Sequence, residues 1–198
     1  MASINETLDN ESLFVPSATT RKTPWIVKGE HKGHLFDCQQ QEVSVLGKYK
    51  AIVYNYRFRI AKENEGSKHT YTDYNTKEEH TVDGKEFVDK EFRASGVFKF
   101  LEPKDGDDFE SNSEGNKSYY RFCKSIGIEI PKRTLDDGTE VSVLPNLTTD
   151  DINGKAVLAV LGDGKPYTNK EGKEVKPIVV KFVKQWSDGV NKDEEIPF

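Results

Sequence analysis

The sequence predicts a mainly β domain that contains a single helix. Several short segments alternate apolar and polar side chains, which is the pattern of a strand with one buried face. One segment, near residue 120, instead spaces its apolar residues as an amphipathic helix does. The 198 residues include 11 Phe, 8 Tyr and 2 Trp although 32% of them are charged, so we expect a compact core. A chain of this length is expected to form one domain with tails.

The first two strands are expected at residues 34–46 and 49–60, with a turn at Gly47-Lys48 between them. The second is the clearest strand in the sequence. Its even-numbered residues from Ile52 to Ile60 are aliphatic or aromatic, and we expect them to be buried. The alternate face is expected to be basic and exposed to solvent. It carries Val53, Asn55, Arg57 and Arg59.

Residues 61–84 form a long polar insertion, which we expect to project as a β-hairpin. Its side chains alternate around His69–Tyr74, and Asp83-Gly84 is a typical turn pair. Loops of this length inside a compact domain are usually functional or disordered. A third strand is then expected within Phe87–Leu101.

The predicted helix follows this third strand. We expect Asn116 to be its N-cap and Gly127 to be its left-handed C′ residue. Pro131 prevents the helix from continuing. The apolar stripe of the helix consists of Tyr119, Phe122, Cys123 and Ile126.

Two more strands are expected at 155–161 and 175–186, joined by a glycine-rich hairpin. The predicted order is therefore three strands, one helix and two strands. A five-stranded Greek-key barrel with a helix between its third and fourth strands is the OB-fold, which binds oligonucleotides and oligosaccharides. We expect this fold for residues 21–186, between a flexible N-terminal arm at 1–20 and an acidic C-terminal tail at 187–198.

The net charge of −5 does not exclude a polyanionic ligand. Residues 1–20 and 187–198 each carry a charge of −3, which leaves the remaining chain at +1. Such a body can carry a basic face, because a ligand responds to the local field. The sequence contains neither a membrane-spanning apolar run nor a secretory signal. The two distant cysteines are expected to be reduced thiols of a cytosolic protein.

The last six residues, Asp193-Glu194-Glu195-Ile196-Pro197-Phe198, carry the strongest motif. They resemble the C-terminal tip of bacterial single-stranded DNA-binding proteins. In that family the tip docks enzymes of replication, recombination and repair. The chemistry fits this role, since a Phe ring fills an apolar pocket, its carboxylate pairs with a basic residue, and the acids steer the approach.

The body resembles phage-encoded single-stranded DNA-binding proteins, an OB-fold group, in its strand pattern and in the segments Gly96–Leu101 and Ser118–Gly127. The resemblance implies sequence-independent binding of single-stranded DNA in the cytoplasm of a bacterial host, with recruitment of host or phage enzymes through the tip. The link at 187–192 is much shorter than the linkers of bacterial members. The body does not match the bacterial protein, so the sequence leaves open whether the chain forms a homo-oligomer.

Binding a single strand requires cations along the phosphates and flat rings beneath the bases. We expect the cations on the exposed face of the second strand, at its turn, on the third and last strands and on the projecting hairpin. The candidate contact residues are Lys48, Arg57, Arg59, Lys68, Tyr71, Tyr74, Phe92, Arg93, Lys181, Lys184, Trp25 and Trp186.

The sequence favours no metal, cofactor or enzymatic activity. His31, His34 and Cys38 have ligand-like spacing, but a structural zinc site needs four ligands. We therefore expect two solvated histidines beside a buried cysteine. The chain contains no phosphate loop and no nucleophile elbow. The alternative to DNA binding is an acidic interaction protein that sequesters a host replication or repair enzyme.

Overall fold

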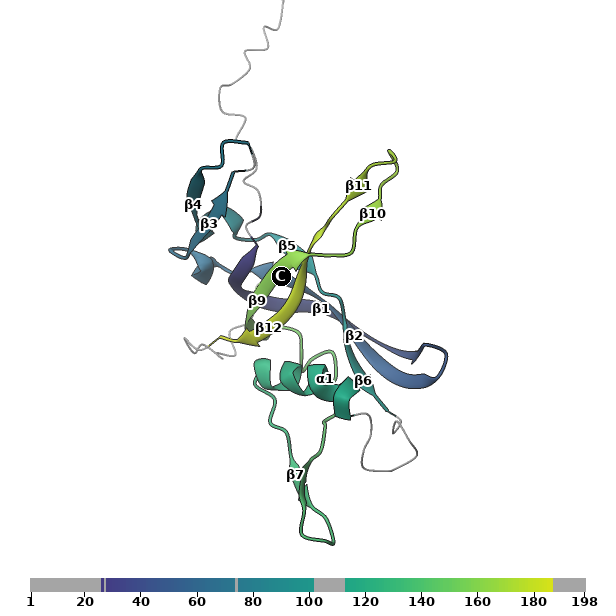
Figure 1. The fold of residues 1–198 in the computed structure, drawn as a ribbon. Helices are drawn as coiled ribbons and strands as arrows, with labels where there is room; N and C mark the ends of the chain where they lie inside the picture. Colours follow the sequence, from purple (N-terminus) through teal and green to yellow (C-terminus); the bar gives the residue numbers. More distant parts are fainter. Residues whose placement is uncertain (1–25, 27, 74, 102–112, 187–198) are drawn as a thin grey trace, which may run out of the picture.

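The computed structural model describes residues 26, 28–73, 75–101 and 113–186. Its centre is a six-stranded antiparallel sheet with the order β12-β9-β1-β2-β5, in which β6 also pairs with β2 (Figure 1). The strands of this main sheet are β1 (Gly29–Val45), β2 (Tyr49–Ile60), β5 (Glu91–Arg93), β6 (Val97–Phe100), β9 (Ala156–Asp163) and β12 (Ile178–Gln185).

The boundaries of β2 agree with the predicted strand at 49–60, whereas β1 begins earlier than predicted. The predicted third strand is divided into β5 and β6. Gly96 lies in the break with a φ of +81°, and a Cβ there would lie 2.8 Å from the Asn55 side chain. Only glycine fits this crossing without strain.

A single α-helix, α1 (Ser113–Ser125), lies within the described residues. It begins before the predicted N-cap, so that prediction for Asn116 is wrong. The Asn116 side chain instead bonds the backbone of β6, accepting from the Phe100 N–H at 2.8 Å and donating to its C=O at 3.1 Å. Gly127 has a φ of +74°, as expected for a residue that ends a helix.

The core lies between α1 and the inner face of the main sheet. The even-numbered residues of β2 from Ile52 to Ile60 are buried, as predicted. Tyr119 and Phe122 of α1 stack on Tyr54 and Tyr56 of β2, with ring centroids 5.7 and 5.3 Å apart. These contacts fix the inner face of the sheet and leave the opposite face of β2 for Arg57 and Arg59.

Val53 is buried although its position predicts exposure. It pairs with Phe98 of β6, and the Gly96 backbone approaches its side chain. The two cysteines, Cys38 within an irregularity of β1 and Cys123 in α1, are buried and form no disulfide. Burial raises the pKa of each thiol to about 11.

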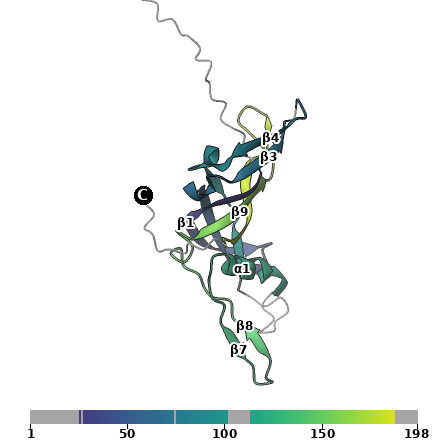
Figure 2. The same cartoon turned by 90° about the vertical axis from the view of Figure 1, so that its left-hand side faces the viewer.

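Three two-stranded hairpins extend from this body (Figures 1 and 2). The predicted projecting hairpin is present as β3 (Lys68–Thr72) and β4 (Glu79–Asp83), between the short 3-10 helices η1 (Lys62–Asn64) and η2 (Gly84–Phe87). The predicted glycine-rich hairpin contains β10 (Tyr167–Thr168) and β11 (Glu174–Val175). A third hairpin, β7 (Lys132–Thr134) and β8 (Glu140–Ser142), was not expected from the sequence.

The mainly β class is confirmed for the described residues, but their hydrogen-bond ladders do not close into a barrel. One isolated parallel bridge, Ala94 to Val180, joins the β5–β6 connection to β12. Beyond this bridge, α1 lies against the edge of β12, where the Ser125 hydroxyl donates to the Val183 carbonyl at 2.9 Å. Within the described residues, no helix is long and apolar enough to cross a membrane.

Candidate nucleic-acid interface

One face of the main sheet, turned away from α1, gathers basic and aromatic side chains from three neighbouring strands. Strand alternation places these residues opposite the buried Leu35, Phe58 and Phe92. The register aligns His34 with Arg59 and Glu91, and Phe36 with Arg57 and Arg93. We call this set the outer face; it consists of Lys32, His34, Phe36, Arg57, Arg59, Glu91 and Arg93.

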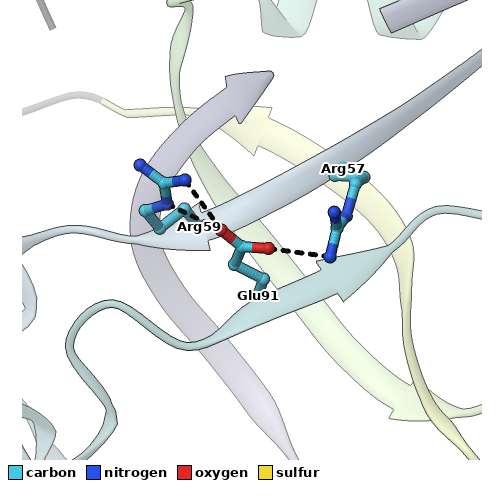
Figure 3. A network of polar contacts seen from close by, with 3 residues as sticks. All are labelled: Arg57, Arg59 and Glu91. Atoms are coloured by element: carbon cyan, nitrogen blue, oxygen red, sulfur yellow. Dashed lines mark hydrogen bonds and ion pairs between the residues drawn. The ribbon is translucent and has the colours of Figure 1, made fainter. Parts of the chain in front are cut away.

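A single carboxylate organises the centre of the outer face (Figure 3). Arg59 donates from Nε and Nη2 to Glu91 Oε1, at 3.1 and 2.7 Å. Arg57 Nη2 lies 2.7 Å from the other oxygen, Oε2. The two guanidinium carbons lie 5.3 and 4.7 Å from the centroid of the Phe36 ring. Two cations are thus held at fixed positions beside one partly exposed ring.

Two donors on this side of the sheet are left unsatisfied. Arg57 Nε and Trp186 Nε1 are buried atoms with no hydrogen-bond partner in the part of the chain that the structure describes. Buried donors are normally paired, so an unpaired one points to a missing acceptor such as a ligand oxygen or a water. A phosphate beside Arg57 would supply that acceptor.

Trp186 extends the outer face beyond the end of β12. Its ring centroid lies 6.3 Å from that of His34, and the Lys32 ammonium lies 5.5 Å above it. Burial lowers the pKa of His34, and the charge of Glu63 partly opposes this shift. His34 is therefore neutral at pH 7, and its ring contributes an uncharged surface.

Further along β12, three exposed side chains continue this surface. Lys184 forms an ion pair with Glu30 of β1. Lys181 donates to the Asp163 carbonyl at 3.0 Å, and Phe182 exposes 51% of its surface. The structure thus brings Arg57, Arg59, Arg93, Lys181, Lys184 and Trp186 of the predicted contact residues onto one connected surface.

Three other predicted contact residues are exposed or partly exposed but lie elsewhere. Lys48 lies at the β1–β2 turn, with its ammonium 5.1 Å from the Tyr49 ring centroid. Lys68 and Tyr71 belong to the β3–β4 hairpin, where Tyr71 stacks on His80. These three residues contact a ligand on the outer face only if that ligand also reaches the β1–β2 turn or the β3–β4 hairpin.

Phe92 requires a correction. It is only 8% exposed and belongs to the core, because its register with Phe58 places it on the inner face of β5. We therefore remove it from the contact residues. Trp25, Tyr74, the arm at 1–20 and the tail at 187–198, including the tip from Asp193 to Phe198, lie outside the described residues.

Sequence reasoning missed Phe36 and Glu91. A break in the β1 register between Phe36 and Gln39, with Asp37 at a φ of +49°, obscures the alternation around Phe36. The partnership of Glu91 with Arg57 and Arg59 depends on strand pairing over more than thirty residues, which leaves no local signal. Only the sequence His34-Leu35-Phe36 indicated the partly exposed position of Phe36, since a buried Leu35 places its two neighbours, both with rings, on the opposite face.

The ligand-like spacing of His31, His34 and Cys38 does not produce a convergent set. His31 is fully buried rather than solvated as predicted, and it stacks on His69 with centroids 4.1 Å apart. His34 lies on the opposite face of β1. Within the described residues, no group of three or more His, Cys, Asp or Glu side chains is arranged to hold a metal ion.

Comparisons with known protein families, curated proteins and solved structures found no match to this chain. Its function is therefore inferred from the outer face and from the sequence motifs.

Proposed function

We propose that this protein binds single-stranded DNA without sequence preference, and that the outer face is its primary contact surface. The observation that carries the proposal is the cluster of Arg57, Arg59 and Phe36, in which two guanidinium groups flank one ring. The unpartnered Nε of Arg57 adds an unused donor at the same place. Cations for phosphates beside rings for bases are what a single strand requires.

Binding through this cluster needs no base-specific hydrogen bonds. Phosphates pair with the guanidinium groups while a base stacks on the Phe36 ring, and every base offers such a face. Glu91 restrains both arginines before the ligand arrives, which reduces the ordering cost of binding. The contact is then tolerant of sequence and sensitive to salt.

The strand arrangement supports an OB-like domain. Its strand order is β12-β9-β1-β2-β5, and α1 follows β5 and β6 and precedes β9 and β12 in the chain. The parallel bridge from Ala94 to Val180 lies where such a sheet would close on itself. OB-folds bind oligonucleotides across the strand face and adjoining loops, and the outer face is such a strand face.

The acidic tip supports a second part of the proposal. By resemblance to single-stranded DNA-binding proteins, residues 193–198 dock enzymes of replication, recombination or repair. We place the protein in a phage module that acts in the bacterial cytoplasm. The DNA-binding part and the tip are separable, because the tip follows the last strand of the sheet.

The test is a fluorescence titration with poly-dT at two salt concentrations, read through the tryptophan emission. Arg57→Ala combined with Arg59→Ala should weaken binding and reduce the salt slope by about 1.4, since each lost phosphate contact contributes about 0.7 on a single strand. The matched control is Lys132→Ala with Arg133→Ala on the β7–β8 hairpin, which makes the same charge change.

The proposal fails if the unmodified protein does not bind poly-dT at low salt. That result would favour the acidic interaction protein that sequesters an enzyme. Binding by the unmodified protein with equal losses in the Arg57/Arg59 variant and the control would contradict the outer face as the contact surface.

A further inference from the structure

A pocket of about 790 Å³ lies between β6, α1 and the edge of β12. Lys181, Phe182 and Lys184 of β12 line this pocket and also continue the outer face, so the two surfaces meet at β12. We call this pocket the edge groove. The side chains that determine its chemistry are Phe98, Arg121, Lys124, Lys181, Phe182 and Lys184.

The edge groove is strongly basic in an acidic protein. Four of its lining residues are Lys or Arg and none is Asp or Glu, although the whole chain carries a charge of −5. Arg121 is exposed on α1. A local excess of positive charge attracts an anionic ligand.

Aromatic rings lie on both sides of the groove. Phe98 of β6 is 36% exposed and Phe182 of β12 is 51% exposed, which is unusual for large apolar side chains. A ligand that covers these rings removes apolar surface from water and gains stacking energy. The groove therefore fits a ligand that is both anionic and flat-ringed.

Part of the groove backbone is already bonded, which limits strand addition by a peptide. Strand addition needs free N–H and C=O groups along an edge. On the β6 side, the N–H and C=O of Phe100 are both taken by Asn116. On the β12 side, the C=O of Val183 is taken by Ser125. The rings of Phe98 and Phe182 and the cations of Arg121 and Lys124 remain for the ligand, and a single-stranded nucleic acid uses such groups.

We propose that the edge groove is a second contact site for single-stranded DNA, and that one strand passes from the outer face over β12 into it. Lys181, Phe182 and Lys184 form the connection between the two surfaces. Arg121 and Lys124 hold phosphates within the groove, and Phe98 stacks on a base. This inference rests on the proposed function, because it assumes the same ligand.

The test compares dT strands of about 6 and about 30 nucleotides, which lie near the lower end of the usual coverage of about 4–16 nucleotides per domain and well above it. The groove variant is Arg121→Ala with Lys124→Ala, and the outer-face variant is Arg57→Ala with Arg59→Ala. Lys132→Ala with Arg133→Ala again serves as the charge-matched control. Circular dichroism of each variant verifies the fold.

The groove variant should bind the long strand several-fold more weakly, with a salt slope lower by about 1.4, and should bind the short strand as the unmodified protein does. The outer-face variant should lose affinity for both strands. Ultraviolet cross-linking of the long strand to the unmodified protein, mapped by mass spectrometry, should give adducts at Phe98 or Phe182 as well as at Phe36.

Unchanged long-strand binding by the groove variant, with adducts at Phe36 alone, would overturn the groove inference and leave the proposed function intact. Absence of binding by the unmodified protein would overturn both. Binding of a synthetic peptide of residues 187–198 to the unmodified protein, lost in the groove variant while DNA binding is kept, would assign the groove to a peptide and contradict the inference.

Discussion

Arg57 and Arg59 are held on either side of the Glu91 carboxylate, with closest N···O distances of 2.7 Å for each pair. All three side chains are partly exposed, and ion pairs in that setting contribute little to stability. Glu91 therefore acts mainly on the position of the two guanidinium groups and on the net charge around them. It orients two guanidinium groups and also cancels part of the field that a phosphate would feel.

Glu91→Gln tests this balance at the residue scale. The amide retains one hydrogen-bond acceptor but removes a negative charge, so we expect several-fold tighter binding of poly-dT at low salt. The gain should diminish near 0.15 M salt, where the screening length is about 8 Å. The measurement is the same titration, with Glu140→Gln on β8 as the charge-matched control. Weaker binding by Glu91→Gln alone would mean that positioning outweighs charge.

The buried pair of His31 and His69 is a second residue-scale feature. The Asn64 amide nitrogen lies 3.3 Å from His31 Nδ1 and 3.4 Å from His69 Nε2, so it can donate to either ring only while that nitrogen is unprotonated. Burial lowers the pKa of His69 from 6.5, and the charge of Asp83 partly opposes this. The unfolded chain therefore binds a proton at higher pH than the folded one.

The sign of the pH effect follows from that difference. The contribution of neutral His69 to the free energy of unfolding is fully present above about pH 6.5, the pKa of the unfolded chain. It is lost as the pH falls through the lower pKa of the folded protein. We expect urea unfolding to show this loss as the pH falls below about 6.5, and His69→Gln to show less of it. His80→Gln, on the surface of the same hairpin, is the control and should keep the loss. An equal pH dependence in all three proteins would contradict the role of His69.

At the scale of elements, sequence patterns predicted buried faces correctly where the alternation or helical spacing within one segment determines which side chains are buried. The alternation in 49–60 predicted β2 and its buried face, and the helical spacing from Tyr119 to Ile126 predicted the stripe of α1. The predictions are wrong where contact with a segment distant in the sequence determines the position of a side chain. Val53 is covered by β6, Phe92 is placed by its register with Phe58, and Asn116 is bonded to β6 instead of capping the helix.

The same distinction applies to the candidate site. Arg57 and Arg59 were predictable because strand alternation assigns their face. Glu91 and the edge groove were not, since both require knowledge of which strands and helices are neighbours. The β7–β8 hairpin was missed because its strands have three residues each, too few for an alternating pattern.

The β3–β4 hairpin provides the element-scale prediction. Replacing Thr72–Glu79 by Asn-Gly keeps the Tyr71–His80 pair and the buried His69, while it removes the projecting end. If this end covers bound DNA, the variant should occlude fewer nucleotides and release DNA faster with an unchanged fold. Reverse titration and stopped-flow release measure both quantities.

A matched shortening of the β7–β8 hairpin, in which Asn-Gly replaces Leu135–Thr139 between the paired Thr134 and Glu140, is the control. It should leave the occluded length and the release rate unchanged. Native values for both quantities in the Thr72–Glu79 variant would show that the projecting end is a solvated loop.

The whole molecule combines a nearly neutral body with an acidic tail. Under the proposed function, this charge pattern separates two tasks: the body binds DNA and the tail docks enzymes. Deleting Phe198 should abolish enzyme docking and leave affinity for poly-dT unchanged or slightly higher. A pull-down from host-cell lysate compares the intact and shortened proteins, and a variant with one residue added after Phe198 should behave as the deletion does. Identical sets of captured enzymes would contradict the tip assignment.

The burial of Cys38 in β1 and Cys123 in α1 has a practical consequence for kinetics. With a pKa of about 11 for each thiol, only about one molecule in a thousand carries a given thiolate at pH 8, and that thiolate is shielded by the core. A disulfide reagent therefore reacts only after the surrounding structure opens. Equal labelling rates at the two thiols would indicate global unfolding, and faster labelling at Cys123 would show that α1 separates from the sheet first. Because the edge groove lies between α1 and β12, bound DNA should slow labelling of Cys123 more than that of Cys38.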